Sequence, residues 1–300
     1  MAELRIGLVG AGRLGEQGYV PALAAAAGVR LAAVAEPDEA RRARVAGAAG
    51  VPGYRSAEDL LAAGGVDALV LATPASAHLA DARLAAAAGL PALVEKPPAA
   101  DVAEAAELAA LEPTPWIGFN RRFDDGVARL REAVPRGAEV GVFCEISYRR
   151  AGWDAHTVRD DALTDLGPHL VDLARWLTGA DVTDVRRADV RRERAGFDLV
   201  LGAARARIRC ATDRPYRERI EVRHRDGRLV GRLSRGGLVA AVRGRLASRG
   251  PHPLVASLTA QLEAFARAVR GELEPTLATA EDGVAVMAAL DAVRAARLSG

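Results

Sequence analysis

The amino-acid sequence predicts an α/β protein in which a doubly wound parallel sheet is followed by an α+β domain built on a mostly antiparallel open sheet. Up to about residue 119, short apolar runs alternate with longer helical segments, which is typical of a parallel sheet with helices on both faces. After residue 120, strand-like runs follow one another without helices between them, which indicates antiparallel pairing. The length of 300 residues fits two domains, and we expect them to span residues 1–119 and 120–300.

In the first domain, the apolar runs predict strands and the segments between them predict helices. These segments are rich in Ala, Leu, Glu and Arg, which are strong helix formers. The strand candidates are Leu4–Val9, Leu31–Ala35, Ala68–Ala72, Ala92–Glu95 and Trp116–Phe119. The helix candidates are Leu14–Ala27, Glu39–Ala49, Ala57–Ala63, His78–Ala88 and Val102–Leu111.

The second domain is expected to hold a run of strands with helices before, within and after it. The strand candidates are Val140–Tyr148, Val182–Val190, Phe197–Leu201, Ala206–Cys210, Arg219–Arg223 and Arg228–Leu233. The helix candidates are Gly126–Glu132, Leu166–Leu177, Ser257–Arg270 and Ala280–Leu298.

The composition is that of a soluble globular chain, with half of the residues apolar. The basic residues are 40 arginines and one lysine, and they are interleaved with 39 acidic residues to give a net charge of +2, so we expect no nucleic-acid partner. Two cysteines are too few for a disulfide framework or a four-ligand zinc site, and no metal is expected. The chain shows no signal segment and no apolar run of about 18 residues, which predicts a cytoplasmic protein without a membrane partner.

A glycine-rich turn follows the first predicted strand. Gly10, Gly12 and Gly15 form a Gly-x-Gly-x-x-Gly pattern, with Arg13 and Leu14 before the last glycine, at the mouth of a predicted helix. In a Rossmann domain the first glycine permits the tight turn, the second lets the backbone approach a pyrophosphate, and the third lets helix and strand pack closely. A glycine turn in another α/β fold is the alternative, but the strand and helix on either side favour a dinucleotide site.

An acidic residue follows the second predicted strand. Glu36 lies 21 residues after Gly15, where a carboxylate can accept hydrogen bonds from the adenosine ribose hydroxyls. Such a carboxylate repels a 2′-phosphate, so Glu36 favours NAD, although Arg41 and Arg42 lie close enough in sequence to keep NADP as a second option. The alternative is that Glu36 serves as an acid in the first turn of the next helix.

Lys96 is the only lysine of the chain and lies at the end of the fifth predicted strand. Ligands of open α/β sheets bind at this carboxyl edge, so an active-site role is favoured over an ordinary surface lysine. Asp165 and His169 are four residues apart and would share one helix face. The alternatives are that Asp165 caps the helix that Pro168 helps to begin, and that His169 is a structural histidine paired with Asp172.

Together these segments resemble the glucose-fructose oxidoreductase/inositol dehydrogenase (Gfo/Idh/MocA) family of NAD(P)-dependent oxidoreductases. The resemblance covers nearly the whole chain and rests on six motifs in the right order. They are the glycine motif, Ala72-Thr73-Pro74 with His78, Glu95-Lys96-Pro97, Gly118-Phe119-Asn120-Arg121-Arg122-Phe123, Asp165-x-Gly167-x-His169-x-x-Asp172 and Glu281-Asp282-Gly283.

The resemblance implies that Lys96, Asp165 and His169 are the catalytic group. His169 would take the hydroxyl proton, Lys96 would stabilise the developing alkoxide, and Asp165 would orient the substrate or His169. Besides the glycine motif and Glu36, the expected cofactor contacts are Thr73, Pro74, His78, Glu95 and Lys96. The expected substrate contacts are Asn120, Arg122, Trp153, His156, Asp165 and His169.

The implied activity is hydride transfer between NAD, or NADP, and a small polar substrate such as a sugar, a cyclitol or a related hydroxyl or keto compound. Two alternatives stay open: an NAD-dependent glycosidase that oxidises its substrate transiently, and a nucleotide-sensing regulator without turnover. Family members commonly use the open sheet as a subunit interface, which predicts a homo-oligomer, a dimer or tetramer. Their last helix, here about residues 280–298, usually packs back on the Rossmann domain.

The sequence departs from the family pattern at two places. The family often has glycines before the aspartate, whereas this chain has Arg159-Asp160-Asp161, and Ala75 replaces the usual asparagine after Thr-Pro. Glycines allow a ligand to approach the backbone closely. The charged replacements therefore predict a reshaped substrate pocket, or a loop that recognises an amine or another polar group.

Overall fold

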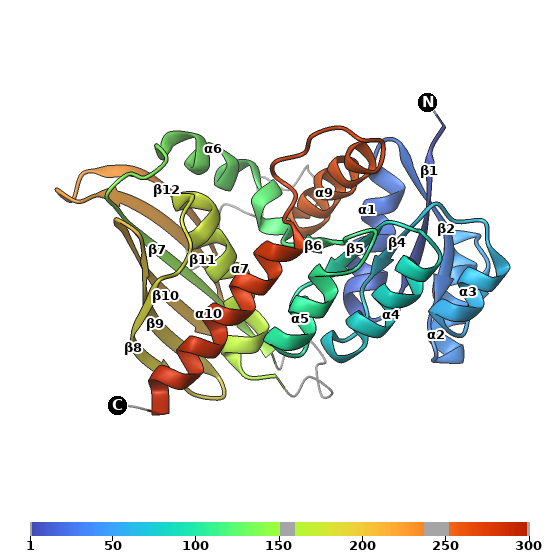
Figure 1. Cartoon of the computed structure of the whole chain (residues 1–300), viewed down its shortest axis with the longest axis horizontal. Helices are drawn as coiled ribbons and strands as arrows, with labels where there is room; N and C mark the ends of the chain where they lie inside the picture. Colours follow the sequence, from blue (N-terminus) through green and yellow to red (C-terminus); the bar gives the residue numbers. More distant parts are fainter. Residues whose placement is uncertain (1, 151–159, 237–251, 299–300) are drawn as a thin grey trace. The chain divides into compact units, whose positions relative to one another are not determined.

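The computed structural model describes residues 2–150, 160–236 and 252–298, which form two compact units (Figure 1). The first unit consists of Met1–Phe123 and Pro251–Val284, and the second consists of Asp124–Gly250 and Ala285–Gly300. The expected Trp153, His156 and Arg159 lie outside the described residues. Within those residues, no helix combines the length and the apolar character that a membrane crossing needs.

A six-stranded parallel sheet forms the centre of the first unit, in the order β3-β2-β1-β4-β5-β6. Its strands are β1 (Leu4–Val9), β2 (Val29–Ala35), β3 (Gly53–Tyr54), β4 (Ala68–Leu71), β5 (Ala92–Glu95) and β6 (Trp116–Gly118). Strands β1, β4 and β5 lie side by side, and the apolar side chains of β4, of β5 and of residues 6–9 in β1 are buried. This strand order is that of a doubly wound dinucleotide-binding domain, so the predicted fold class of this part is confirmed.

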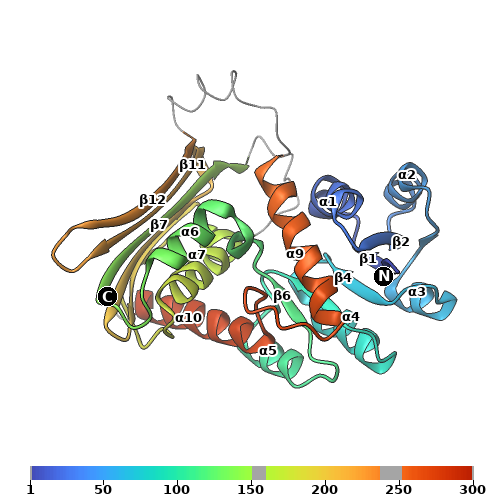
Figure 2. The same cartoon turned by 90° about the horizontal axis from the view of Figure 1, so that it is seen from above.

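Helices cover both faces of this sheet. They are the π-helical turn η1 (Gly15–Tyr19), α1 (Val20–Ala25), α2 (Glu39–Ala49), α3 (Ala57–Ala63), α4 (Ala75–Ala87), α5 (Val102–Ala109), the 3₁₀ turn η2 (Asn120–Phe123) and α9 (Pro253–Val269). Figure 2 shows α1, α2 and α9 on one face and α3, α4 and α5 on the other. Leu258, Leu262 and Phe265 of α9 belong to one buried core with Ile6 and Leu8 of β1.

Two details of the first unit differ from the sequence expectation. The helix expected over Leu14–Ala27 is divided, because a π-helical turn precedes α1 and Pro21, which has no N–H to donate, lies in the first turn of α1. Strand β3 was not predicted, since two residues are too short for an apolar pattern to show.

The second unit is built on a six-stranded sheet in the order β12-β11-β7-β10-β9-β8. Its strands are β7 (Val140–Arg149), β8 (Asp184–Val190), β9 (Arg194–Leu201), β10 (Ala204–Ala211), β11 (Asp213–His224) and β12 (Leu229–Gly236). Only the pairing of β10 with β7 is parallel among the described ladders. The expectation of a mostly antiparallel sheet is therefore confirmed.

Helices α6 (Asp125–Ala133) and α7 (Ala162–Thr178) lie on one face of this second sheet (Figure 2). The last helix, α10 (Ala280–Leu298), is divided between the units after Val284. Its later part lies against α7, since a side chain at Gly167 would meet Leu290 at 2.9 Å. After the second sheet, the chain re-enters the first unit, to which it contributes α9 and the residues up to Val284.

The other face of the second sheet carries an unexpected concentration of positive charge. The strand register places ten arginines on this open face: Arg149, Arg186, Arg194, Arg205, Arg207, Arg209, Arg217, Arg219, Arg223 and Arg232. The same face carries six carboxylates: Glu145, Asp184, Asp189, Asp198, Asp213 and Glu221. The expectation that basic and acidic residues are evenly interleaved is wrong for this face, because alternation along each strand sends every second residue to the same side. The absence of a nucleic-acid partner stays a prediction.

Candidate functional site

The glycine-rich turn after β1 has the backbone geometry that a bound dinucleotide requires. Gly10 has a φ of 91°, and a Cβ there would lie 2.7 Å from the backbone of Ala72. A Cβ at Gly15 would lie 2.3 Å from the carbonyl oxygen of Gly10. At Gly12, in contrast, a Cβ would meet no atom within 4 Å, so the space beside this residue is open. The turn is therefore closed where strand and helix pack and open where a pyrophosphate would approach the backbone.

Glu36 is buried at the end of β2 and is bonded to this turn. Its Oε2 accepts a hydrogen bond from the backbone N–H of Ala11 at 2.9 Å, and its Oε1 accepts one from Arg41 at 3.2 Å. The N-cap of α2 is Asp38, whose side chain accepts from the N–H of Arg41. Glu36 lies before the first turn of α2, where Glu39 is the acidic residue, so the alternative of an acid in that turn is wrong. Glu36, expected to favour NAD, is paired with Arg41, which kept NADP as a second option.

Lys96 follows a carboxylate that is buried at the end of β5. Glu95 accepts hydrogen bonds from the Tyr19 hydroxyl at 2.6 Å and from the N–H of Lys96 at 2.9 Å. Burial raises the pKa of Glu95, and the bond from Tyr19 and the charge of Lys96 offset part of that rise. The side chain of Lys96 is half-buried. Tyr19 is missed by sequence reasoning, because a tyrosine on the apolar face of a helix has no signal that separates it from the core.

His78 connects the loops that follow β4 and β5. Its Nε2 lies 2.8 Å from the carbonyl oxygen of Thr73, and its Nδ1 lies 3.0 Å from that of Pro97. Burial lowers the pKa of His78, although the two carbonyls act in the opposite direction. Thr73 also donates to Asp81, and Pro74 occupies the N-cap position of α4. These contacts connect the loop after β4, which is adjacent to the glycine-rich turn, to the loop after β5, and the supporting role of His78 stays a prediction.

Asn120 and Arg122 follow β6 and are almost fully buried. Asn120 donates to the hydroxyl of Ser257 at 3.0 Å, and Arg122 pairs with Asp282 at 3.0 Å. Both partners belong to the first unit. These two side chains therefore attach α9 and the start of α10 to the parallel sheet, whatever further contacts they make.

Asp165 and His169 lie together on α7, both half-buried. The helix begins at Ala162, and its N-cap is Asp161, which accepts from the N–H of Thr164 at 2.8 Å. The alternative that Asp165 caps a helix begun by Pro168 is wrong, because Pro168 lies inside the helix. The spacing of four residues places Asp165 and His169 on one helix face.

Two side chains from the end of β7 reach Asp165. The Tyr148 hydroxyl donates to its Oδ2, and Arg150 pairs with the same oxygen at 3.0 Å. Burial, together with the neighbouring charge of Asp165, raises the pKa of Tyr148 to about 12. Neither Tyr148 nor Arg150 was predicted, since a strand end is brought to the helix only by the folding of the second sheet.

The charged residues that replace the family glycines have structural partners. The carbonyl oxygen of Asp160 accepts from Arg150 at 2.6 Å, and Asp161 pairs with Arg294 at 2.9 Å in addition to its capping bond. Asp161 also accepts from the Thr164 hydroxyl. The side chain of Asp161 and the main chain of Asp160 therefore secure the start of the helix that bears Asp165, and recognition of an amine by this segment stays a prediction.

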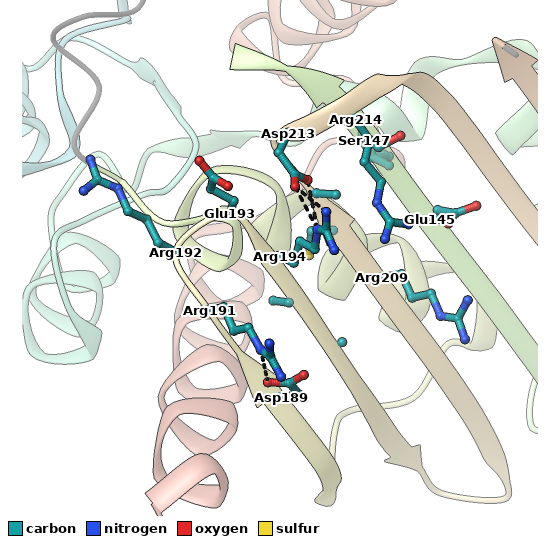
Figure 3. Close-up of a pocket in the computed structure, with 15 residues that line it drawn as sticks. Glu145, Ser147, Asp189, Arg191, Arg192, Glu193, Arg194, Arg209, Asp213 and Arg214 are labelled. Carbon is teal, nitrogen blue, oxygen red and sulfur yellow. Dashed lines mark hydrogen bonds and ion pairs between the residues drawn. The ribbon is translucent and has the colours of Figure 1, made fainter. Parts of the chain in front are cut away.

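A cavity of about 810 Å³ lies on the open face of the second sheet (Figure 3). Charged side chains line it, and two of its ion pairs are Arg194 with Asp213 and Arg191 with Asp189. No expected catalytic or cofactor residue contributes to its lining. The expected site therefore does not coincide with this cavity. Among the residues that the structure describes, no group of three His, Cys, Asp or Glu side chains could hold a metal ion.

Comparisons with known proteins agree with this fold and these motifs. The model of an oxidoreductase family with an NAD-binding Rossmann fold matches residues 4–114. The rhizopine catabolism protein MocA of Rhizobium meliloti is 34% identical over 207 residues. The match covers 65% of this chain and 64% of MocA, so it spans less than two thirds of either protein. A D-xylose 1-dehydrogenase (NADP(+)) of Haloferax volcanii is 31% identical over 315 residues, covering 97% of this chain and 96% of the relative.

Solved structures share the same fold over nearly the full length. The scyllo-inositol dehydrogenase of Lactobacillus casei, solved with NAD(H) and scyllo-inositol, has a TM-score of 0.81 at 19% identity and covers 99% of this chain and 97% of its own. The order of strands and the nearly full-length relative lead to one assignment. The chain belongs to the Gfo/Idh/MocA family of oxidoreductases with an NAD-binding Rossmann fold.

Proposed function

We propose that this protein is an NAD-dependent dehydrogenase or reductase that acts on a hydroxyl carbon of a cyclitol or sugar, or on the corresponding ketone or imine. The single observation that carries the proposal is the open space beside Gly12, next to a buried Glu36 that is bonded to the same turn. Relatives named for D-xylose and structural neighbours named for scyllo-inositol support the substrate class.

The residues of the first unit fit the cofactor. Gly10, Gly12 and Gly15 would hold the pyrophosphate at the start of η1, where backbone N–H groups and the helix dipole favour negative charge. Glu36 would accept hydrogen bonds from the ribose hydroxyls. When bound, NAD supplies the hydride acceptor of the reaction. Arg13, Leu14, Thr73, Pro74, His78 and Glu95 complete the proposed cofactor contacts.

The catalytic group that we propose consists of Lys96, Asp165 and His169. His169 takes the proton of the substrate hydroxyl, since an imidazole can accept and return a proton near neutral pH. Lys96 donates hydrogen bonds to the oxygen as its negative charge develops. Asp165 orients the substrate or His169. In the reductive direction, His169 and Lys96 are the proposed proton donors.

Substrate contacts and assembly are also proposals. Asn120 and Arg122 from the first unit, together with Trp153 and His156, are proposed to contact the substrate. The protein is proposed to form a homo-oligomer, as the family resemblance implies.

A substrate panel tests the proposed activity. The purified protein is mixed with NAD or NADP and with myo-inositol, scyllo-inositol, D-xylose and amino sugars, and the reduced cofactor is followed by absorbance. Accumulation of reduced cofactor is the expected result, and it distinguishes a dehydrogenase from a glycosidase that re-reduces its substrate. If the protein binds NADH but turns over neither the members of the panel nor their keto forms, the result favours the nucleotide-sensing regulator over the dehydrogenase.

Replacing Lys96 by arginine tests the role of the lysine. The planar guanidinium keeps the charge but cannot reproduce the compact ammonium, so we expect at least a tenfold loss of kcat with little change in NADH affinity. Near-normal turnover of Lys96→Arg would show that our role for Lys96 is wrong.

A further inference from the structure

The end of β7 sends two hydrogen-bond donors to one carboxylate oxygen on α7. Tyr148 is the next-to-last residue of the strand, and Arg150 follows the strand directly. The Tyr148 hydroxyl donates to Oδ2 of Asp165. The Nη2 of Arg150 donates to the same oxygen at 3.0 Å. All three residues belong to the second unit. No motif of the sequence analysis includes either donor.

The arrangement is shielded from solvent and fixed at several points. The side chains of Arg150 and Asp165 are 15% and 18% exposed, so their ion pair is screened less than a surface pair. Arg150 Nη1 also donates to the carbonyl oxygen of Asp160 at 2.6 Å, which holds the guanidinium plane. The helix that carries Asp165 is held at its start by the capping residue Asp161. The carboxylate is thus fixed both through its own helix and through the neighbouring strand.

The guanidinium of Arg150 is not fully hydrogen-bonded. Its Nε is buried and has no hydrogen-bond partner among the described residues. A buried donor without a partner destabilises a fold, and such donors are rare in native proteins. The observed placement favours the two directed contacts of Arg150, to Asp165 and to Asp160.

We propose that Tyr148 and Arg150 are positioning residues that hold the Asp165 carboxylate in the orientation in which it meets the substrate or His169. This inference rests on the proposed function of Asp165. Tyr148 acts as a neutral donor, since its raised pKa keeps the phenol protonated at neutral pH. Asp165 then serves as a fixed acceptor, and proton transfer is left to His169.

Kinetics with matched controls test the positioning role. The variants are Tyr148→Phe, Arg150→Met and Arg150→Lys, and the controls are Tyr216→Phe and Arg83→Met, which change an exposed tyrosine and an exposed arginine that pairs with Glu107. With NAD and scyllo-inositol, Tyr148→Phe and Arg150→Met should lower kcat/KM about 10- to 100-fold, because small misplacements of catalytic groups have effects of this size. Arg150→Lys should recover part of the loss, and the controls should stay within twofold of wild type.

Two further measurements separate positioning from a general structural effect. The NADH dissociation constant should stay within twofold of wild type in every variant. The pH profile of kcat/KM should keep its shape in Tyr148→Phe and only decrease in height, whereas loss of the alkaline limb would make Tyr148 a proton carrier and overturn the proposal. Unchanged kcat/KM in both Tyr148→Phe and Arg150→Met would also overturn it.

A substrate-free measurement keeps the inference testable if the proposed function fails. In a double-mutant cycle of Tyr148→Phe with Asp165→Asn, the shifts in the urea midpoint should be clearly non-additive, since the two residues are in contact. Additive shifts would refute the contact, and with it the positioning role. If wild type turns over no sugar or cyclitol, the proposed function is wrong, and the cycle alone decides whether Tyr148 holds Asp165.

Discussion

Replacing Gly12 with alanine should weaken NADH binding without destabilising the fold. The φ of Gly12 lies outside the left-handed region, and a Cβ there would meet no atom within 4 Å. A methyl group fits the protein alone, so the free energy of unfolding should stay unchanged or rise by up to about 1 kcal/mol, as a glycine-to-alanine change restricts the unfolded chain.

The expected loss of affinity follows from the place that the methyl group takes. If it displaces the pyrophosphate from one backbone N–H, the lost charge-assisted hydrogen bond is worth about 1.5–3 kcal/mol. At about 1.4 kcal/mol for each factor of ten, the NADH dissociation constant should rise roughly 10- to 150-fold. Fluorescence titration with NADH measures this change, and urea unfolding measures stability on the same samples.

Alanine substitutions of two other glycines serve as controls for this experiment. Gly47→Ala in α2 also adds a methyl group that meets nothing within 4 Å, and it should leave NADH binding unchanged. Gly15→Ala places its methyl 2.3 Å from the carbonyl oxygen of Gly10 and should destabilise the fold itself. Wild-type NADH affinity in Gly12→Ala would refute the assignment of this turn to the pyrophosphate. A large loss of stability in the same variant would show that the space beside Gly12 is not open.

Three more predictions concern the cofactor preference, the pH dependence and the helix start. Glu36→Ser should raise the ratio of NADPH to NADH affinity at least tenfold, because it removes a carboxylate that repels a 2′-phosphate and releases Arg41 from its ion pair; an unchanged ratio in paired titrations would contradict this role. Because the folded-state pKa of His78 is lowered by burial, its stabilising contribution is present above the unfolded value of about 6.5 and is lost as the pH falls below it; thermal unfolding from pH 7.5 to 5 should show a decline that is smaller in His78→Gln. Asp161→Ala should reduce the free energy of unfolding by about 0.5–2 kcal/mol through loss of the N-cap of α7, and a urea midpoint equal to wild type would argue against that cap.

The parallel sheet could be predicted in detail because its strands are continuous buried apolar runs. Strands Leu4–Val9 and Ala92–Glu95 were predicted to the residue. Strand β11 was expected only over Arg219–Arg223, yet it extends over Asp213–His224. Its first residues are exposed and include Arg214 and Arg217, so they lack the apolar alternation from which a strand is recognised.

The candidate site could be predicted where one short segment carries the whole signal. Gly10, Gly12 and Gly15 are recognisable because their spacing, between a strand and a helix, has a direct physical reason. Contacts between distant segments could not be predicted. For example, the Tyr19 hydroxyl donates to Glu95, which is 76 residues away in the sequence. Tyr148 and Arg150 are closer to Asp165 in sequence, but only the packing of α7 on the sheet brings them to it.

The continuity of helix α7 fixes the orientation of two proposed catalytic side chains relative to each other. Asp165 and His169 lie on one continuous helix, which begins at the cap Asp161 and ends at Gly179 in the left-handed conformation. Their mutual orientation is set by helix geometry, and inserting a single residue between them would rotate one against the other by about 100°. Asp160 and Asp161 at the start of this helix contact Arg150 and Arg294, but a substitution at either position leaves the spacing of Asp165 and His169 unchanged. In the proposed function, an insertion within α7 would therefore disrupt the catalytic pair, whereas a substitution before the helix would leave the orientation of the pair intact.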